Sequence, residues 1–307
     1  MAEQGVTVVV PTLNRGGFLL NCVQDLIAQD HRPLEILIVD QSPEPARALL
    51  ELAREWPDLV TYHRVGFRGL PEARNYGWQG ARYDAIVFVD DDIRCGPDLV
   101  LEHLRALRLP GVGVVAGGID EPGRPADGRV TAGTFRRWTA TPLRGFASAA
   151  EHDVDHAQGC NFSAWRRALE AAGGFDERLN VGAALYEEAD FCLRAGRAGY
   201  RVYFSGKARV VHLGAAAGGC RVGDVVGYVR GLAHNRAVLI RRHVRWFEVP
   251  TALMRLAIMG CAFAVHYGTP GALPACARGA LEGWRDGALP VGCGGCQTDL
   301  RGRESRG

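Results

Sequence analysis

The sequence predicts an α/β fold with a mostly parallel, doubly wound sheet, followed by a C-terminal helical region. Short apolar runs rich in β-branched residues, at residues 6–10, 34–39 and 86–89, have the character of strands buried on both faces. Stretches with apolar residues at helical spacing separate these runs at short intervals, as in a parallel sheet. Several runs end in polar or acidic residues, which is typical of strands whose carboxyl ends bind a ligand.

Length and composition narrow the class of protein. A chain of 307 residues can form one large α/β domain or two small ones. Its hydrophobic fraction of 47% and charged fraction of 23% are those of an ordinary globular protein. The net charge of +2 gives no electrostatic case for nucleic-acid binding. No basic and apolar leader opens the sequence, so a cytoplasmic location is expected. The nine scattered cysteines fit reduced thiols better than a disulfide framework.

The first half of the chain alternates between strand and helix. The first strand stops at Pro11, which has no N–H to donate to a sheet, and Thr12 or Asn14 is expected to cap the helix that follows to about residue 29. The second strand ends at Asp40, with Ser42 just beyond it. The remaining elements expected here are helices over 46–56, 70–80 and 97–107, and strands over 59–65, 86–89 and 112–116.

Three consecutive carboxylates, Asp90, Asp91 and Asp92, end the strand at 86–89. Adjacent like charges repel, and an apolar core would not hold them. A divalent cation such as Mg²⁺ or Mn²⁺, which prefers oxygen ligands, would explain the cluster. A solvated acidic turn before the next helix explains the triplet alone about equally well.

The segment 117–150 is rich in Gly and Pro and is expected to be a surface insertion, with a loop over the crevice as the alternative. Beyond it, we expect a helix ending near residue 171, a helix over 187–198, and strands over 201–204 and 208–211. Glu187, Glu188 and Asp190 crowd the first turn of the second helix. The helix dipole favours acidic residues there, which explains part of this acidity without a catalytic role.

The C-terminal third is expected to be helical. A helix is predicted over 224–243, and the apolar segment 249–267 is interrupted by Arg255 and His266, which weakens the case for a transmembrane span. We favour a helical pair packed on the catalytic part, or a homodimer contact. A peripheral position on an anionic membrane surface is the alternative, because basic residues precede the segment. Cys293 and Cys296 form a lone pair for which a reduced, flexible tail is the default interpretation.

Several motifs, taken together in their order and spacing, resemble the inverting glycosyltransferases of GT-A fold and family 2 type, such as rhamnosyl- and glucosyltransferases. The resemblance covers about residues 6–214. The motifs are Val-Val-Val-Pro-Thr-Leu-Asn-Arg at 8–15, Ile-Val-Asp-Gln-Ser at 38–42, Gly-Leu-Pro-Glu-Ala-Arg-Asn-Tyr-Gly at 69–77, Val-Asp-Asp-Asp at 89–92, Gly-Cys-Asn-Phe-Ser at 159–163, Gly-Gly-Phe-Asp-Glu at 173–177, Glu-Glu-Ala-Asp-Phe-Cys-Leu-Arg at 187–194 and Val-His at 211–212.

This resemblance implies a GT-A catalytic domain over 1–215, with a nucleotide-binding half over about 1–118 and an acceptor half over about 150–215. A C-terminal helical region over 216–290 and a flexible tail over 291–307 would follow. It further implies that a sugar moves from a nucleotide-diphosphate donor, UDP- or dTDP-linked, to an acceptor hydroxyl. The acceptor would be a glycan, a lipid-linked molecule or a small molecule.

The resemblance also implies roles for individual residues. Glu188 is expected to be the catalytic base, and Asp92 and His212 to bind a divalent metal, Mn²⁺ or Mg²⁺. Asn161, Glu187 and Asp190 are expected on the acceptor side. The residues expected to bind the donor are Pro11, Thr12, Asn14, Arg15, Asp40, Ser42, Arg74, Asp90 and Asp91.

Two other functions stay open at this point. A sugar nucleotidyltransferase would keep the fold, but such enzymes usually carry a Gly-rich basic loop after the first strand, where this chain has Pro11-Thr12-Leu13-Asn14. A non-catalytic, nucleotide-sugar-binding scaffold subunit would be expected to have lost its catalytic positions. Asp92 and Glu188 are both present, which gives that function no support.

Overall fold

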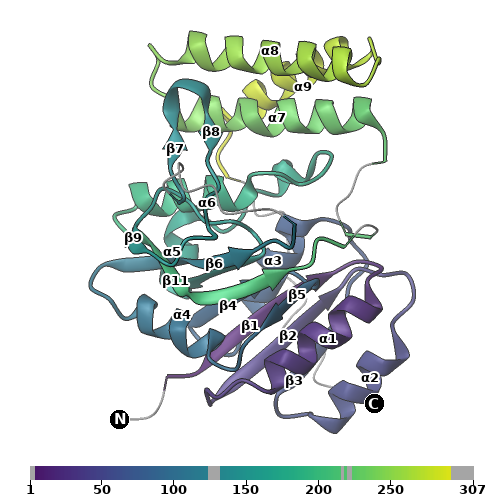
Figure 1. Cartoon of the computed structure of the whole chain (residues 1–307), viewed down its shortest axis with the longest axis vertical. Helices are drawn as coiled ribbons and strands as arrows, with labels where there is room; N and C mark the ends of the chain where they lie inside the picture. The colour runs from purple at the N-terminus through teal and green to yellow at the C-terminus, as the bar shows by residue number, and fades with distance from the viewer. Residues whose placement is uncertain (1–3, 124–131, 216–217, 220–222, 292–307) are drawn as a thin grey trace.

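We describe the fold from a computed structural model, in which residues 4–123, 132–215, 218–219 and 223–291 are described. A nine-stranded sheet forms the centre of its lower body (Figure 1). Eight strands follow the order β3-β2-β1-β4-β10-β6-β11-β5, and β9 pairs with β11. The strands are β1 (Val6–Thr12), β2 (Leu34–Asp40), β3 (Val60–Arg64), β4 (Ala85–Val89), β5 (Ile93–Cys95), β6 (Val112–Asp120), β9 (Glu151–Asp153), β10 (Asn161–Trp165) and β11 (Arg201–His212).

The predicted α/β class, with a mostly parallel central sheet and C-terminal helices, is confirmed. The strands β3, β2, β1 and β4 are parallel to one another, and β11 is parallel to β6. Strand β10 lies between β4 and β6 and is antiparallel to both, so β4 and β6 run in the same direction. The strands β1, β2 and β4 are buried along their whole length, which explains their unbroken apolar runs.

Helices pack against this sheet and link its strands. The N-terminal ones are α1 (Gly16–Ile27), α2 (Arg47–Glu55), α3 (Leu70–Gly80) and α4 (Leu99–Leu107), and α5 (Arg166–Ala172) and α6 (Glu187–Arg197) follow β10. The predicted cap of the first helix is wrong. Strand β1 continues through Thr12, and Arg15 occupies the N-cap position of α1 without a side-chain cap. Asn14 instead has a left-handed φ of 57° in the turn between them.

The insertion after β6 contains more regular structure than its composition indicated. Strand β6 itself runs on to Asp120, so the predicted irregular segment begins later than residue 117. A short hairpin follows, formed by β7 (Phe135–Arg136) and β8 (Thr141–Pro142) around the 3-10 turn η1 (Arg137–Thr139). The two strands predicted at 201–204 and 208–211 are a single strand, β11, with an irregularity in its pairing between Ser205 and Arg209.

Three C-terminal helices, α7 (Val225–His243), α8 (Val249–His266) and α9 (Ala272–Asp286), form what we call the helical cap, at the top of Figure 1. The three helices contact one another, and they enclose a second hydrophobic core that Phe135 of the hairpin enters. The Cys293–Cys296 pair and the predicted tail, except Val291, lie outside the described residues.

Candidate active site

The carboxyl ends of β1, β2, β4, β6 and β11 share one edge of the sheet, because these strands all run in the same direction. Thr12 and Asp40 are register partners at the ends of β1 and β2. The Asp triplet follows β4, and His212 is the last residue of β11. The topology therefore gathers polar residues from distant parts of the sequence at the position where open α/β sheets bind ligands.

The three aspartates of the triplet have different surroundings. Asp91 is buried and accepts hydrogen bonds from the Thr12 hydroxyl at 2.6 Å and from Arg15 Nη1 at 2.9 Å. Burial raises the pKa of Asp91 to about 6, although both of these donors act in the opposite direction. Asp90 is partly exposed toward the crevice, and burial likewise raises its pKa against the effect of Arg74. Asp91 thus holds the end of β1 and the Arg15 side chain in place, whereas Asp90 faces the crevice.

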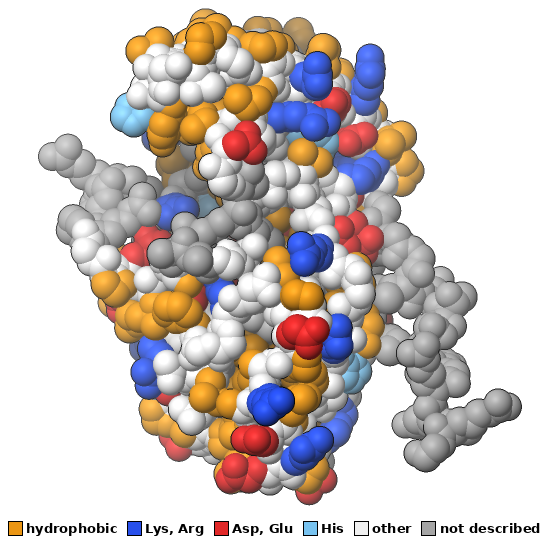
Figure 2. Space-filling model, turned by 90° about the vertical axis from the view of Figure 1, so that its right-hand side faces the viewer, with side chains coloured by type: hydrophobic (Ala, Val, Ile, Leu, Met, Phe, Trp, Pro, Cys, Tyr) orange, Lys and Arg blue, Asp and Glu red, His pale blue; other side chains and the backbone are white. Residues whose placement is uncertain are grey.

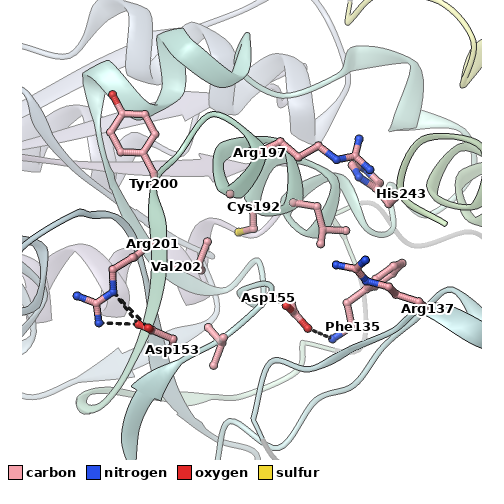
Figure 3. Close-up of a pocket in the computed structure, with 13 residues that line it drawn as sticks. Phe135, Arg137, Asp153, Asp155, Cys192, Arg197, Tyr200, Arg201, Val202 and His243 are labelled. Carbon is pink, nitrogen blue, oxygen red and sulfur yellow. Dashed lines mark hydrogen bonds and ion pairs between the residues drawn. The ribbon is translucent and has the colours of Figure 1, made fainter. Parts of the chain in front are cut away.

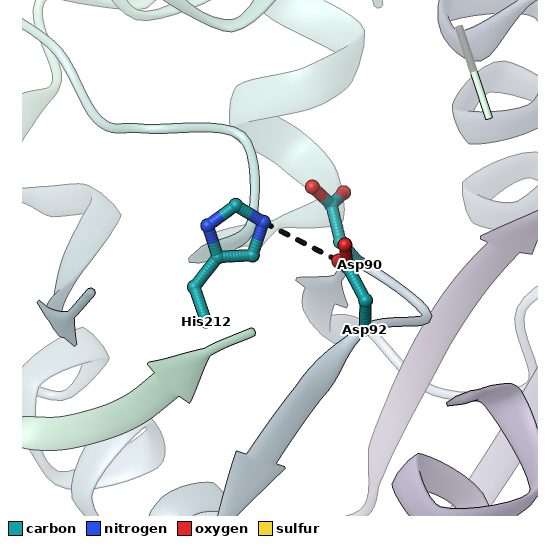
Figure 4. Close-up of side chains that lie close together, drawn as sticks. All are labelled: Asp90, Asp92 and His212. Atoms are coloured by element: carbon teal, nitrogen blue, oxygen red, sulfur yellow. Dashed lines mark ion pairs between the residues drawn. The ribbon is translucent and has the colours of Figure 1, made fainter. Parts of the chain in front are cut away.

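Asp90, Asp92 and His212 could hold a metal ion, because one ligand atom from each lies within 4.8 Å of the others (Figure 4). Asp92 Oδ1 is buried and faces His212 Nε2 at 3.3 Å. Two carboxylates and an imidazole suit a divalent cation such as Mn²⁺. Burial opposes ionisation of Asp92, yet His212 and the Ala215 N–H keep its pKa low, so this ligand carries its charge at neutral pH.

His212 is held between two acids. Its Nε2 faces Asp92, and its Nδ1 lies 3.5 Å from Glu121 Oε1. The hydrogen bond with Asp92 raises the pKa of His212, with burial acting against it. Without a metal, the imidazolium would neutralise part of the acidic cluster. Binding of a cation there would require the imidazole to give up its proton.

The two arginines expected to bind the donor, Arg15 and Arg74, are both paired with acids of the site. Arg15 Nη1 lies 2.9 Å from Asp91 and 3.2 Å from Asp92. Arg74 is only 1% exposed, donates to Glu187 and to the Gly159 carbonyl, and lies 3.4 Å from Asp90. Arg74 is therefore a buried bridge between the Asp triplet and the start of α6.

Asp40 and Ser42 are buried at the carboxyl end of β2, where they form hydrogen bonds with neighbouring segments. Asp40 is 2% exposed and accepts from the Tyr62 hydroxyl at 2.6 Å and from the Ser42 N–H at 2.8 Å. The Ser42 hydroxyl in turn accepts from the Asn14 N–H at 2.8 Å. In this conformation both Asp40 oxygens have partners in the chain, so a donor group that hydrogen-bonds to Asp40 would have to compete with the Tyr62 hydroxyl or the Ser42 N–H.

Two adjoining cavities open at this edge. The first, of about 460 Å³, is lined by the end of β1 and by the Asp triplet, with Arg15 and Gln41 at its sides. The second, of about 180 Å³, leads from Asp90 to Glu188 at the start of α6. Both cavities share the residues Leu70, Asp90, Arg144, Leu185 and His212. Asp90 and His212 thus stand between a larger and a smaller compartment.

The two glutamates at the start of α6, Glu187 and Glu188, differ in how deeply they are buried. Glu187 is 2% exposed and is paired with Arg74. Burial raises the pKa of Glu187 well above its usual range, the charge of Glu188 adds to this, and Arg74 opposes it. Both glutamates line the smaller cavity, but Glu188 is only partly buried. Of the two glutamates, Glu188 is therefore the one in position to meet a substrate.

Two residues expected on the acceptor side are placed elsewhere. Asn161 is fully buried in β10, where its amide donates to the Gly118 and Ala208 carbonyls and its oxygen faces His103. Asp190 is fully buried on the opposite side of α6 from the cavity and pairs with Arg194, Arg242 and His243. Both expectations are corrected here: these side chains hold elements of the fold together.

Sequence reasoning missed Arg144, which follows β8 and lines both cavities, 3.4 Å from Glu121. It also missed Tyr228 of α7, which lines the larger cavity, and Gln158, which lines the smaller one. No motif marks Arg144, because an insertion of irregular composition brings it to the site.

A third cavity, of about 370 Å³, lies between β11, α6 and the hairpin (Figure 3). Arg137, Arg197 and His243 border it on one side, and Asp155, which accepts from the Phe135 N–H at 2.7 Å, borders it on another. None of the residues expected at the active site lines this cavity.

Comparison with known proteins assigns the family and the fold. Residues 7–173 match the sequence profile of the family described as Glycosyl transferase family 2. The chain belongs to glycosyl transferase family 2. The match contains the Asp triplet and the carboxyl ends of β1, β2 and β4, whereas Glu188 and His212 lie beyond it.

Relatives among characterised sequences cover only part of this chain. Glycosyltransferases GlyA and GlyG of Streptococcus pneumoniae serotype 4 are 27% identical over 95 residues and 29% identical over 101 residues. These matches take up 30% and 32% of this chain, but only 13% of GlyA and 32% of GlyG. They agree with the family assignment.

Several solved structures have the same fold and match most of this chain. The mannosyltransferase PcManGT from Pyrobaculum calidifontis, in complex with GDP-Man and Mn²⁺, matches with a TM-score of 0.58 and 22% identity, over 93% of this chain and 76% of that one. TarS 1-349 of S. aureus with UDP-GlcNAc gives 0.57 and 14%, over 92% of both chains. GalNAc-T7 with UDP, GalNAc and Mn²⁺ gives 0.60 and 16%, over 88% and 59%. The GT-A fold predicted from the motifs is therefore confirmed.

Proposed function

We propose that this protein transfers a sugar from a nucleotide-diphosphate donor, UDP- or dTDP-linked, to an acceptor hydroxyl, with inversion at the anomeric carbon. The observation that carries the proposal is the pairing of an acidic site that fits a divalent cation with an accessible carboxylate in the adjoining cavity. The division near residue 215 into a catalytic part and the helical cap, and a cytoplasmic site of reaction, belong to the same proposal, as does a role in polysaccharide or glycoconjugate synthesis.

The larger cavity would hold the donor. Asp90, Asp92 and His212 would hold Mn²⁺ or Mg²⁺, and a metal bound there would neutralise the diphosphate as it leaves. Pro11 and Thr12 line the same cavity at the end of β1 and would face the nucleoside. Two of the solved relatives contain Mn²⁺ with a nucleotide or nucleotide sugar, which supports this arrangement.

Glu188 would be the base that takes the proton from the acceptor hydroxyl. A hydroxyl is a poor nucleophile until a positioned carboxylate accepts its proton. Attack from the smaller cavity, with the leaving group in the larger one, is a single displacement that inverts configuration, so no second carboxylate nucleophile is needed. Glu187, buried against Arg74, would fix the start of α6 and so position Glu188.

The assays described below also distinguish this function from two alternatives. A sugar nucleotidyltransferase would cleave a nucleoside triphosphate, and a scaffold subunit would bind a nucleotide sugar without turnover. The chain has no Gly-rich basic loop after β1, which disfavours the first alternative, and it retains Asp92 and Glu188, which disfavours the second.

The test measures release of nucleoside diphosphate from UDP- and dTDP-sugars in Mn²⁺, together with calorimetric titration of UDP and dTDP in Mn²⁺ and in EDTA. Glu188→Gln should bind nucleotide as the wild type does and lose at least about 100-fold in turnover, the typical effect of removing a general base. Glu55→Gln, on the exposed surface of α2, is the matched control and should keep full turnover. Metal-dependent binding with unchanged turnover in Glu188→Gln would place the base elsewhere.

A further inference from the structure

The outward face of α8 is apolar where a solvent-facing helix would be polar. The inward face packs Ala252, Leu256, Met259 and Gly260 into the core of the helical cap. The outward face carries Leu253, Met254, Ile258 and Val265, which are 38%, 60%, 50% and 83% exposed. A helix that is apolar on all sides is normally covered by protein or by lipid. In the described residues nothing covers this face of α8.

This apolar surface continues on both sides of the helix. Trp246 and Phe247, just before α8, are 85% and 43% exposed, and Tyr267, just after it, is 53% exposed. Leu273 and Leu281 add exposed apolar surface from α9. Figure 2 shows hydrophobic side chains gathered along the upper edge of the molecule, over the helical cap. Contiguous patches of this kind mark an interaction surface.

The charges around this surface are positive. Residues 225–290 contain eight arginines and three carboxylates, and of these arginines Arg236 is buried and Arg242 is paired with Asp176 and Asp190 away from this surface. Each of the three acids has a partner: Glu248 pairs with Arg245, Glu282 with Arg230, and Asp286 with His234. Arg255, on α8 itself, and Arg278 and Arg285, on α9, are exposed. Among the described acids next to these helices, Asp224 is exposed, and its side chain caps α7. On α8 itself, Arg255 stands between the exposed Met254 and Ile258 and gives the apolar face a positive charge.

We propose that α8 lies in the plane of an anionic phospholipid surface, with its outward side chains among the acyl chains and its arginines among the headgroups. An amphipathic element with basic residues beside an apolar face binds such surfaces, with the apolar side chains about 5–10 Å below the headgroups. At about 1.5 Å per residue, the 18 residues of α8 offer a contact roughly 27 Å long. Exposed Trp and Tyr at its two ends suit the membrane–water interface.

The packing distinguishes lying on the membrane from crossing it. The Val249–His266 helix is long and apolar enough to cross a membrane by length and composition. Its inward face, however, contacts α7 and α9 along the helix, and η1 contacts it as well, with Trp138 stacked edge-on against Phe247 at 6.0 Å. A spanning orientation would pull the helix away from these contacts, whereas an in-plane orientation keeps them.

A second copy of the chain fits the outward face of α8 less well than an anionic membrane does. A two-fold contact through this face would place the same patch against itself and bring its unpaired arginines together without acids between them. Anionic headgroups supply the opposite charge, which a second copy lacks. We expect the protein to be monomeric without vesicles.

The experiment is flotation of the purified full chain with two kinds of vesicle, phosphatidylcholine alone and phosphatidylcholine with phosphatidylglycerol. The wild type should float with the anionic vesicles and bind the neutral ones several-fold less. Met254→Gln with Ile258→Gln should lower the partition coefficient about tenfold or more, because two apolar side chains no longer enter the acyl region. Arg255→Gln should reduce the preference for anionic vesicles.

The matched control is Leu101→Gln with Leu109→Gln, two partly exposed leucines outside the helical cap, and it should bind as the wild type does. Unchanged thermal unfolding of each variant shows that the fold is intact. Light scattering after size exclusion gives the oligomeric state. Failure of the wild type to float, equal flotation of the α8 variant, or a dimer that the α8 variant dissociates without any vesicle binding would each overturn the proposal.

Discussion

Replacing Asp190 by Asn tests whether this residue acts on the acceptor or on the fold. Its carboxylate is fully buried and lies 2.8 Å from Arg194 Nε, 3.2 Å from Arg242 Nη1 and 2.8 Å from His243 Nε2. Arg194 belongs to α6, and Arg242 and His243 belong to α7, so this carboxylate joins α6 to the helical cap. Its pKa is far below the usual range: burial opposes ionisation, but Arg194, His243 and Arg242 outweigh it.

The expected loss of stability in Asp190→Asn depends on which hydrogen bonds the partners of Asp190 keep. Removing one partner of a buried ion pair typically costs about 3–5 kcal/mol. Arg242 keeps its bond to Asp176 at 2.6 Å, and Arg194 keeps the Gly174 carbonyl at 2.8 Å, so we expect the lower end of that range. A loss of about 3 kcal/mol corresponds to a Tm lower by roughly 5 °C for a chain of 307 residues, at about 2.1 cal/mol/K of unfolding entropy per residue.

Urea and thermal unfolding measure this change, with Asp58→Asn, on the exposed surface, as the control. Asp190 lines neither cavity of the site, so the folded variant should bind nucleotide normally at low temperature. Because the folded-state pKa of Asp190 is depressed, its stabilisation is present at neutral pH and is lost as the pH falls through that pKa. The variant should therefore lose less stability in acid. A Tm within about 2 °C of the wild type, together with a raised KM for acceptor, would refute this reasoning.

Two further substitutions test the metal site and a partly buried acid, Glu72. Asp92→Asn should abolish the difference between nucleotide binding in Mn²⁺ and in EDTA, and calorimetry showing an unchanged difference would remove Asp92 from the metal site. Burial raises the pKa of Glu72 to about 7, so the folded state holds a proton that the unfolded chain releases above about pH 4.5, and stability falls as the pH rises toward 7. After discounting for partial exposure, Glu72→Gln should be more stable than the wild type by about 1–2 kcal/mol at pH 8 and nearly equal to it near pH 4 in urea unfolding. Equal stability at pH 8 would show that Glu72 ionises in the folded state without a penalty.

Local sequence patterns determined the fold class and the location of the crevice. The β-branched runs that became β1, β2 and β4 are buried on both faces, so their pattern carries the information without reference to distant residues. Parallel strands bring their carboxyl ends to one edge, so Thr12, Asp40 and the Asp triplet could be expected to meet there. The family followed from the order and spacing of the motifs.

Only the tertiary structure decided what several polar residues do, because their partners lie far away in the sequence. Arg74 and Glu187 are 113 positions apart, and their pairing buries an arginine that the motif alone would place against a phosphate. Glu187, Glu188 and Asp190 share one helical turn, yet they face a buried arginine, an open cavity and the helical cap respectively. The sequence showed three acids at a helix start, but which of them meets solvent depends on what packs against each side of α6.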